Sequence, residues 1–208
     1  MPQPHVKHGR QTRNIDTMAE GPMPPFLQIA ILVLVQILLP AYFAGWLVFA
    51  RIPDRAALVL HALYGAVYLA FLWLVGNWQW LSIHAAQALV LIFTAAAAFG
   101  LYRSRHLPWH AGEGRSLVRH HGASLGMIAV FLGLVAYAIA GRFPAERPVE
   151  LAFPLPQGAY IVAHGGDNLL INHHNGNRSQ RYALDIVGLN RFGARASGLF
   201  PADPNQYE

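Results

Sequence analysis

The sequence predicts an α-helical membrane domain of four transmembrane helices, followed by the start of a small antiparallel β domain. Three observations support this fold class. Only 12% of the 208 residues are charged, whereas soluble domains carry roughly a quarter. Residues 56–102 contain no Asp, Glu, Lys or Arg. After residue 142 the composition becomes polar and rich in proline, which marks a second region.

Four apolar segments are long enough to cross a bilayer, whose hydrocarbon core of about 30 Å needs roughly 20 helical residues. They cover residues 26–50, 56–75, 81–102 and 123–140. Pro40 lies in the first segment and should kink that helix without excluding it. A soluble four-helix bundle would need polar stripes at helical period, and these are absent. We therefore expect a membrane domain over residues 26–141, preceded by a flexible N-terminal tail, residues 1–25.

The arginines predict how the spans are oriented, because Arg and Lys are enriched on the cytoplasmic side of membranes. The basic residues between spans one and two and between spans three and four are Arg51, Arg55, Arg103, Arg105, Arg115 and Arg119. The connection Gly76–Trp80 has no charge and holds two tryptophans, as expected at the opposite interface. The polar C-terminal region should then lie outside the cytoplasm, although basic residues in the N-terminal tail argue mildly against this. We interpret the net charge of +5 as topological, and we expect no nucleic-acid partner.

The polar region begins with a proline-punctuated linker, residues 142–157, and continues as an incomplete β domain, residues 158–208. Tyr160–Val162 and Leu169–Asn172 are predicted as short strands that flank a Gly-Gly turn and form a hairpin. Arg181–Val187 alternates in polarity and is the third predicted strand. A sheet of this size is marginal on its own, so we expect a domain that is cut short.

Histidines within the apolar segments are functional candidates by default. His61 and His84 lie at such positions, but neither has a carboxylate nearby in sequence. A neutral imidazole bonded to a neighbouring helix is the simpler interpretation. The histidines beside the arginine-rich loop are explained by lipid headgroups, so we assign them no site: His106, His110, His120 and His121.

Histidines and carboxylates are crowded in the polar region, which contains His164, Asp167, His173, His174 and Asp185. The chain has no cysteine, so zinc would be bound through imidazole nitrogen and carboxylate oxygen. His174 and Asp185 could supply two metal ligands from adjacent antiparallel strands. The spacing alone also fits an exposed loop rich in His and Asn.

The segment Glu150–Leu199, which contains "NHH" at Asn172–His174 and "QRYALDI" at Gln180–Ile186, resembles the start of the lysostaphin-like zinc metallopeptidases. The resemblance is to the membrane-anchored branch of this peptidoglycan endopeptidase family. It implies zinc as cofactor, peptidoglycan as substrate and the bacterial inner membrane as location. In the family, a histidine and an aspartate four residues later both bind zinc.

The resemblance assigns the metal-binding aspartate to Asp185, but the position four residues before it is Arg181. In members with this departure the histidine comes from the end of the preceding strand, which points to His174, with His173 as the alternative. The family's second motif, His-x-His, supplies a third zinc ligand and a catalytic histidine. No histidine follows Asp185, so we expect a fragment that is inactive as it stands, and we assign no catalytic residue.

Three functions remain open from the sequence. The leading hypothesis is a membrane-anchored zinc metallopeptidase that hydrolyses peptide cross-links of the cell wall. The second is a non-catalytic membrane scaffold or sensor with a degenerate peptidase-like region. A dimeric transporter has little support, because no charged residue lies inside a span. The oligomeric state is not predicted.

Overall fold

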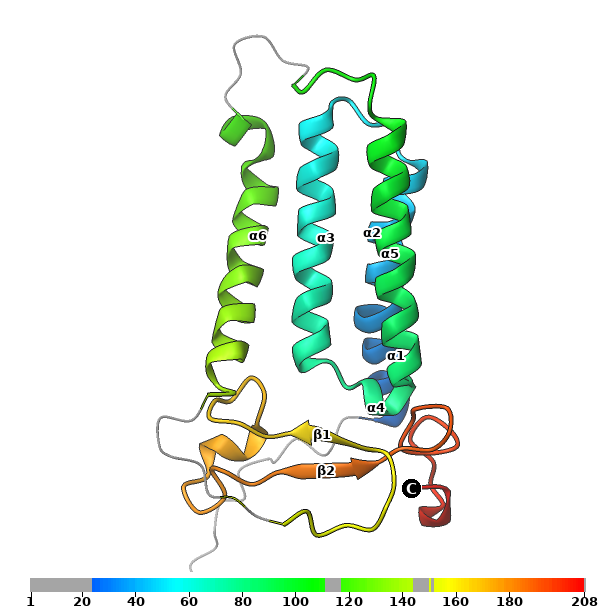
Figure 1. Cartoon of the computed structure of the whole chain (residues 1–208), viewed down its shortest axis with the longest axis vertical. Coiled ribbons are helices and arrows are strands. Elements are labelled where there is room, and N and C mark those ends of the chain that lie inside the picture. Colours follow the sequence, from blue (N-terminus) through cyan, green and yellow to red (C-terminus); the bar gives the residue numbers. More distant parts are fainter. Residues whose placement is uncertain (1–23, 111–116, 144–149, 151, 208) are drawn as a thin grey trace, which may run out of the picture.

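The computed structural model describes residues 24–110, 117–143, 150 and 152–207 (Figure 1). Side chains are described from His121 onward in the last long helix. The predicted N-terminal tail lies outside the described residues except for its last two positions. Most of the predicted linker's first half also lies outside them.

Four helical spans long and apolar enough to cross a membrane confirm the predicted domain. They are Pro25–Phe49, Arg55–Val75 (α3), Ile83–Arg103 (α5) and His121–Ala140, the last within α6 (Leu117–Ala140). Only 11% to 33% of the residues in each span's most apolar window are buried. A soluble bundle would bury its apolar side chains, so these surfaces require lipid, and the chain is a multi-pass membrane protein.

The first span contains a π-helical turn just before the predicted kink site, Pro40. It consists of α1 (Pro25–Val33), the π-helical turn (Leu34–Leu38) and α2 (Leu39–Phe49). In a regular α-helix, Pro40 would clash with the carbonyl of residue 36 and leave it without a donor. The wider turn, with the amide of Leu39 donating to the carbonyl of Leu34, accommodates the proline without breaking the span.

Helix α3 is packed against the other three spans. Its contact with α6 is aromatic, because the Phe131 ring lies 5.2 Å from that of Tyr68 and 5.4 Å from that of Phe71. On another face, Gly65 leaves the space that the Phe93 ring of α5 occupies. The sheet and the short helix α4 (Trp78–Leu81) lie together at one end of the bundle, opposite the ends of α3 and α5 that carry Arg55 and Arg103 (Figure 1).

A two-stranded antiparallel sheet follows the spans, as the fold class predicted. It pairs β1 (Tyr160–His164) with β2 (Asp185–Gly188). The predicted hairpin is wrong, because residues 169–171 form a turn and the partner of β1 is β2. The Asn168 side chain accepts hydrogen bonds from the amides of Leu170 and Ile171, and this local bonding competes with a strand.

The third predicted strand begins later than expected, at Asp185 instead of Arg181. The carbonyls of Arg181 and Ala183 both accept hydrogen bonds from the Asn172 side chain. They are therefore turned toward Asn172 and not toward a neighbouring strand.

The polar region is docked on the helix ends at two places. At α6, the amide of Asp167 donates to the carbonyl of Gly141, and the side chain of Asn168 donates to that of Tyr137. Near α5, the Arg195 guanidinium lies 4.3 Å from the ring centre of Trp80. Trp80 also stacks on Phe200 at 3.9 Å. These contacts support a sheet that would be marginal alone.

Candidate metal centre

Asn172 organises the histidine-rich segment of the polar region. Its side chain is fully buried and donates to the carbonyls of Gly166 and Arg181, each at 2.9 Å. Its Oδ1 accepts from the amide of His174 at 3.0 Å, which caps the 3-10 helix His173–Gly176. Because an asparagine is a favourable cap, this residue fixes where the histidine pair begins.

A β-bulge places His164 beside Asp185. The pairing runs regularly from Tyr160 to Val162 and then shifts by one residue, so that His164 is opposite Asp185. A bulge inserts one extra residue and redirects the side chains beyond it. The next turn contains Gly166 at a φ of 118°, a conformation that favours glycine.

Three residues of the cluster, His164, His173 and Asp185, have ligand atoms that all lie within 4.8 Å of one another. His173 Nδ1 is 3.8 Å from Asp185 Oδ2. His174 Nε2 is 3.0 Å from the other carboxylate oxygen, Oδ1. Two imidazoles and one carboxylate form a donor set that suits zinc, and three protein ligands leave a position open.

The predicted ligands are thus brought together in part. Asp185 belongs to the group, whereas His174 bonds to the carboxylate from outside it, and the alternative residue, His173, lies inside. His174 lies on a 3-10 helix and not on a strand paired with that of Asp185. His164 was noted as part of the cluster but not predicted as a ligand, because the bulge that brings it to Asp185 has no clear sequence signal.

Arg181 is held by Asp167. Its Nε and Nη2 atoms lie 2.9 and 2.7 Å from Asp167 Oδ1. Arg181, four residues before Asp185, therefore forms an ion pair within the loop. This ion pair links the segment before β2 to the turn that contains Asp167.

The electrostatics of the cluster favour neutral His164. Burial is the main cause that lowers the pKa of this imidazole, and the neighbouring His173 lowers it further, although Asp185 opposes the shift. A neutral imidazole is the form that binds a metal. The cluster is also accessible, because the side chains of His173 and Asp185 are 57% and 36% exposed.

The histidines of the membrane spans have packing roles. The His61 ring stacks on Trp46 at 3.9 Å. His84 Nδ1 lies 3.3 Å from Gln87 Oε1, at the end of α5 that supports the polar region. The His61 contact is with a neighbouring helix, as expected, but it is a ring stack. His84 bonds a residue of its own helix and not a neighbouring helix, so that part of the simpler interpretation is wrong for His84.

No family model, curated protein or solved structure matches the chain. The lysostaphin-like resemblance therefore stays a prediction, and the case for a metal depends on the geometry of the cluster.

Proposed function

We propose that this chain is a membrane-anchored zinc metallopeptidase that acts on peptide cross-links of the cell wall. The observation that carries the proposal is the grouping of His164 and His173 with Asp185 within 4.8 Å. The resemblance of the segment to lysostaphin-like enzymes supplies the substrate class. Zinc, when bound, lowers the pKa of its water to about 7 and polarises the scissile carbonyl.

The side chains of the cluster have different roles in binding zinc. Asp185 presents Oδ2 toward His173 and receives the hydrogen bond of His174 at Oδ1. Partners of this kind orient metal ligands and are themselves important for affinity. His164 enters from β1 and completes a set of three ligands without the family's second motif. The expectation of inactivity from sequence is therefore open to a direct test.

Orientation in the membrane is part of the proposal. The uncharged connection that contains α4 lies at the same end of the bundle as β1 and β2, and the ends that carry Arg55 and Arg103 lie at the other (Figure 1). The arginine rule then puts the polar region on the outer side of the bacterial inner membrane. Peptidoglycan is found on that side.

The test uses the full chain, purified in detergent without a polyhistidine tag. Zinc-loaded protein should hydrolyse a synthetic cross-linked peptide of peptidoglycan composition. The D185N and H173Q variants should lose this activity, whereas H106Q, in an exposed turn at the other end of the bundle, should keep it. Zinc-independent hydrolysis, or hydrolysis that survives D185N, would contradict the proposal.

A non-catalytic scaffold or sensor is the second candidate function. The observation in its favour is that Arg181, at the usual histidine position, is engaged by Asp167. For a scaffold or sensor we expect stoichiometric zinc binding through Asp185 with no hydrolysis of the cross-linked peptide. That combination of results would replace the peptidase proposal by this one.

A further inference from the structure

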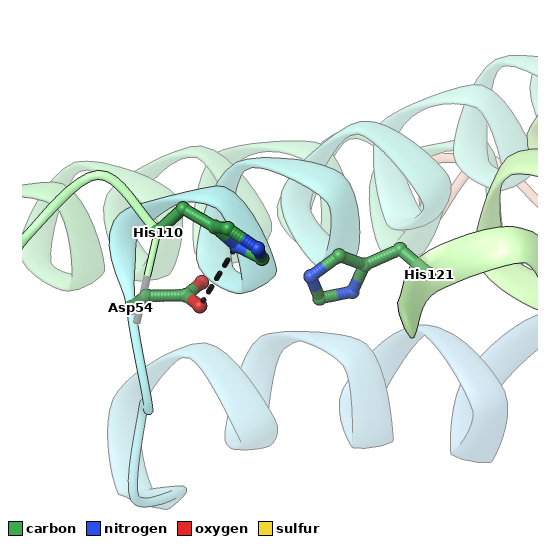
Figure 2. A group of neighbouring side chains, drawn as sticks. All are labelled: Asp54, His110 and His121. Atoms are coloured by element: carbon green, nitrogen blue, oxygen red, sulfur yellow. Dashed lines mark ion pairs between the residues drawn. The ribbon is translucent and has the colours of Figure 1, made fainter. Parts of the chain in front are cut away.

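A second His/Asp group lies at the end of the bundle opposite the sheet. It consists of Asp54, His110 and His121, whose ligand atoms lie within 4.8 Å of one another. Asp54 precedes α3, His110 is in the connection from α5 to α6, and His121 is in the second turn of α6. Figure 2 shows the His121 ring directed from α6 toward the other two side chains.

We propose that these three residues bind a divalent transition-metal ion of the zinc class, which fastens the start of α6 to the start of α3. The proposal is independent of the metallopeptidase function, because it concerns other residues at the other end of the helices.

The backbone around Asp54 builds the site. The amides of Arg55 and Ala56 donate to the carbonyls of Pro108 and Trp109, each at 3.0 Å. These bonds hold the connection from α5 on the beginning of α3 and satisfy amides that a helix start leaves without partners. His110, the next residue, is consequently placed beside Asp54.

The two oxygens of Asp54 have separate tasks. Oδ1 accepts from the amide of Ala57 at 2.7 Å and caps α3. Oδ2 faces His110 Nδ1 at 3.5 Å. The cap orients the carboxylate, so its second oxygen is presented to the histidines in a fixed direction.

The separation of Asp54 and His110 fits joint ligands of an ion. Charge-assisted N–H···O bonds are usually about 2.7 to 2.9 Å long, and this pair is wider at 3.5 Å. Two ligands of a tetrahedral zinc, each about 2.0 to 2.1 Å from the metal, are roughly 3.3 Å apart. Small movements of His121 would complete the set, since the three ligand atoms, one from each residue, lie within 4.8 Å of one another.

Burial and donor chemistry decide the kind of ligand. The Asp54 side chain is only 3% exposed and that of His110 is 23% exposed, so an ion held between them would be mostly shielded from solvent. Calcium and magnesium prefer oxygen donors. Two imidazoles with one carboxylate instead suit zinc, cobalt, nickel or copper.

The position of the site indicates a structural role. The α6 span has the smallest buried share of the four, 11% of its most apolar window. Gly122 and Gly126, on its first turns, have no neighbour within 4 Å of where a Cβ would be. The aromatic contact at Phe131 holds the middle of α6, and the bound ion would hold its beginning.

The first test is a Co²⁺ titration of the full chain without a polyhistidine tag, in an H173Q/D185N background that removes the other site. We expect about one equivalent of Co²⁺ with the absorption of a tetrahedral complex. Further substitution by H110Q/H121Q should abolish that absorption, whereas the matched pair H84Q/H106Q should retain it. Absence of stoichiometric binding in the background protein, or binding that survives H110Q/H121Q, would overturn the proposal.

A second measurement separates metal binding from loss of fold. Hydrogen exchange of the first turns of α6 should slow when Zn²⁺ is added to the background protein. When H121Q is added to that background, Zn²⁺ should leave the exchange rate unchanged. Circular dichroism should show the same helix content in both proteins. Equal protection of α6 with and without Zn²⁺ in the background protein would contradict the fastening role.

Discussion

The two His/Asp groups use the same donor atoms in different surroundings. Asp185 has a side chain that is 36% exposed and lies beside a 57% exposed histidine, whereas the Asp54 side chain is 3% exposed and caps a long helix. An exposed group can meet a substrate, and a buried group at a helix start can only join elements. Exposure and local hydrogen bonding, more than ligand type, therefore separate a candidate catalytic site from a structural one.

The largest effect on stability is expected from the substitution N172A in the polar region. The Asn172 side chain is fully buried and bonded to carbonyls of two neighbouring segments. Leaving several buried groups without partners should cost about 3 kcal/mol or more. Hydrogen exchange should then show opening of residues 160–188, with α3 and α5 unchanged. Intact protection of residues 160–188 would refute the organising role of Asn172.

Substitution of the two adjacent histidines should separate a ligand from its partner. H173Q removes a proposed ligand and should weaken zinc binding to the polar region more than about 100-fold. H174Q removes only the hydrogen bond to Asp185 and should weaken zinc binding by about 10- to 100-fold. Isothermal titration calorimetry in an H110Q/H121Q background measures the zinc affinity of both variants. A larger loss in H174Q would return His174 to the ligand position that the sequence favoured.

A pair of variants at Asp54 separates its cap from its charge. D54A removes the cap of α3 and should lower the free energy of unfolding by about 1 to 2 kcal/mol. D54N keeps a favourable capping residue and should retain most of that stability while losing the metal. Thermal unfolding in detergent, followed by circular dichroism, provides the comparison. Equal destabilisation by D54N and D54A without metal would show that the cap is not the main role of this side chain.

The smallest effect is expected at Arg181. Its side chain is 48% exposed, and ion pairs of this exposure contribute about 0 to 1 kcal/mol. R181M should therefore change the stability of the polar region little and leave zinc binding intact. Loss of zinc in R181M, measured after dialysis, would mean that the ion pair with Asp167 positions the ligands.

The sequence was sufficient to predict the membrane domain but not the geometry of the candidate site. Hydropathy predicted the four spans to within a few residues, because length and apolarity decide whether a helix crosses a bilayer. The accommodation of Pro40 by a π-helical turn was not predictable, since it depends on local helix geometry. In the polar region, Asn168 and Asn172 bind the backbone with their side chains, so a segment that resembled a strand became a series of turns.

Both His/Asp groups show why sites are harder to predict than spans. His164 reaches Asp185 through a one-residue bulge, which strand alternation does not indicate. Asp54 stands before an apolar segment as a typical capping residue, so that part of the second group was visible in the sequence. Its two histidines are far along the chain. His110 is placed beside Asp54 because the carbonyls of Pro108 and Trp109 bind the start of α3, and His121 comes from α6.

The most direct test of the account is the zinc content of four untagged proteins after equilibration with zinc and dialysis, measured by mass spectrometry. We expect about two equivalents in the native chain, about one in H173Q/D185N, about one in H110Q/H121Q, and none when all four substitutions are combined. Zinc content that H173Q/D185N leaves unchanged would contradict the central claim that Asp185 and its histidines bind the metal of the polar region.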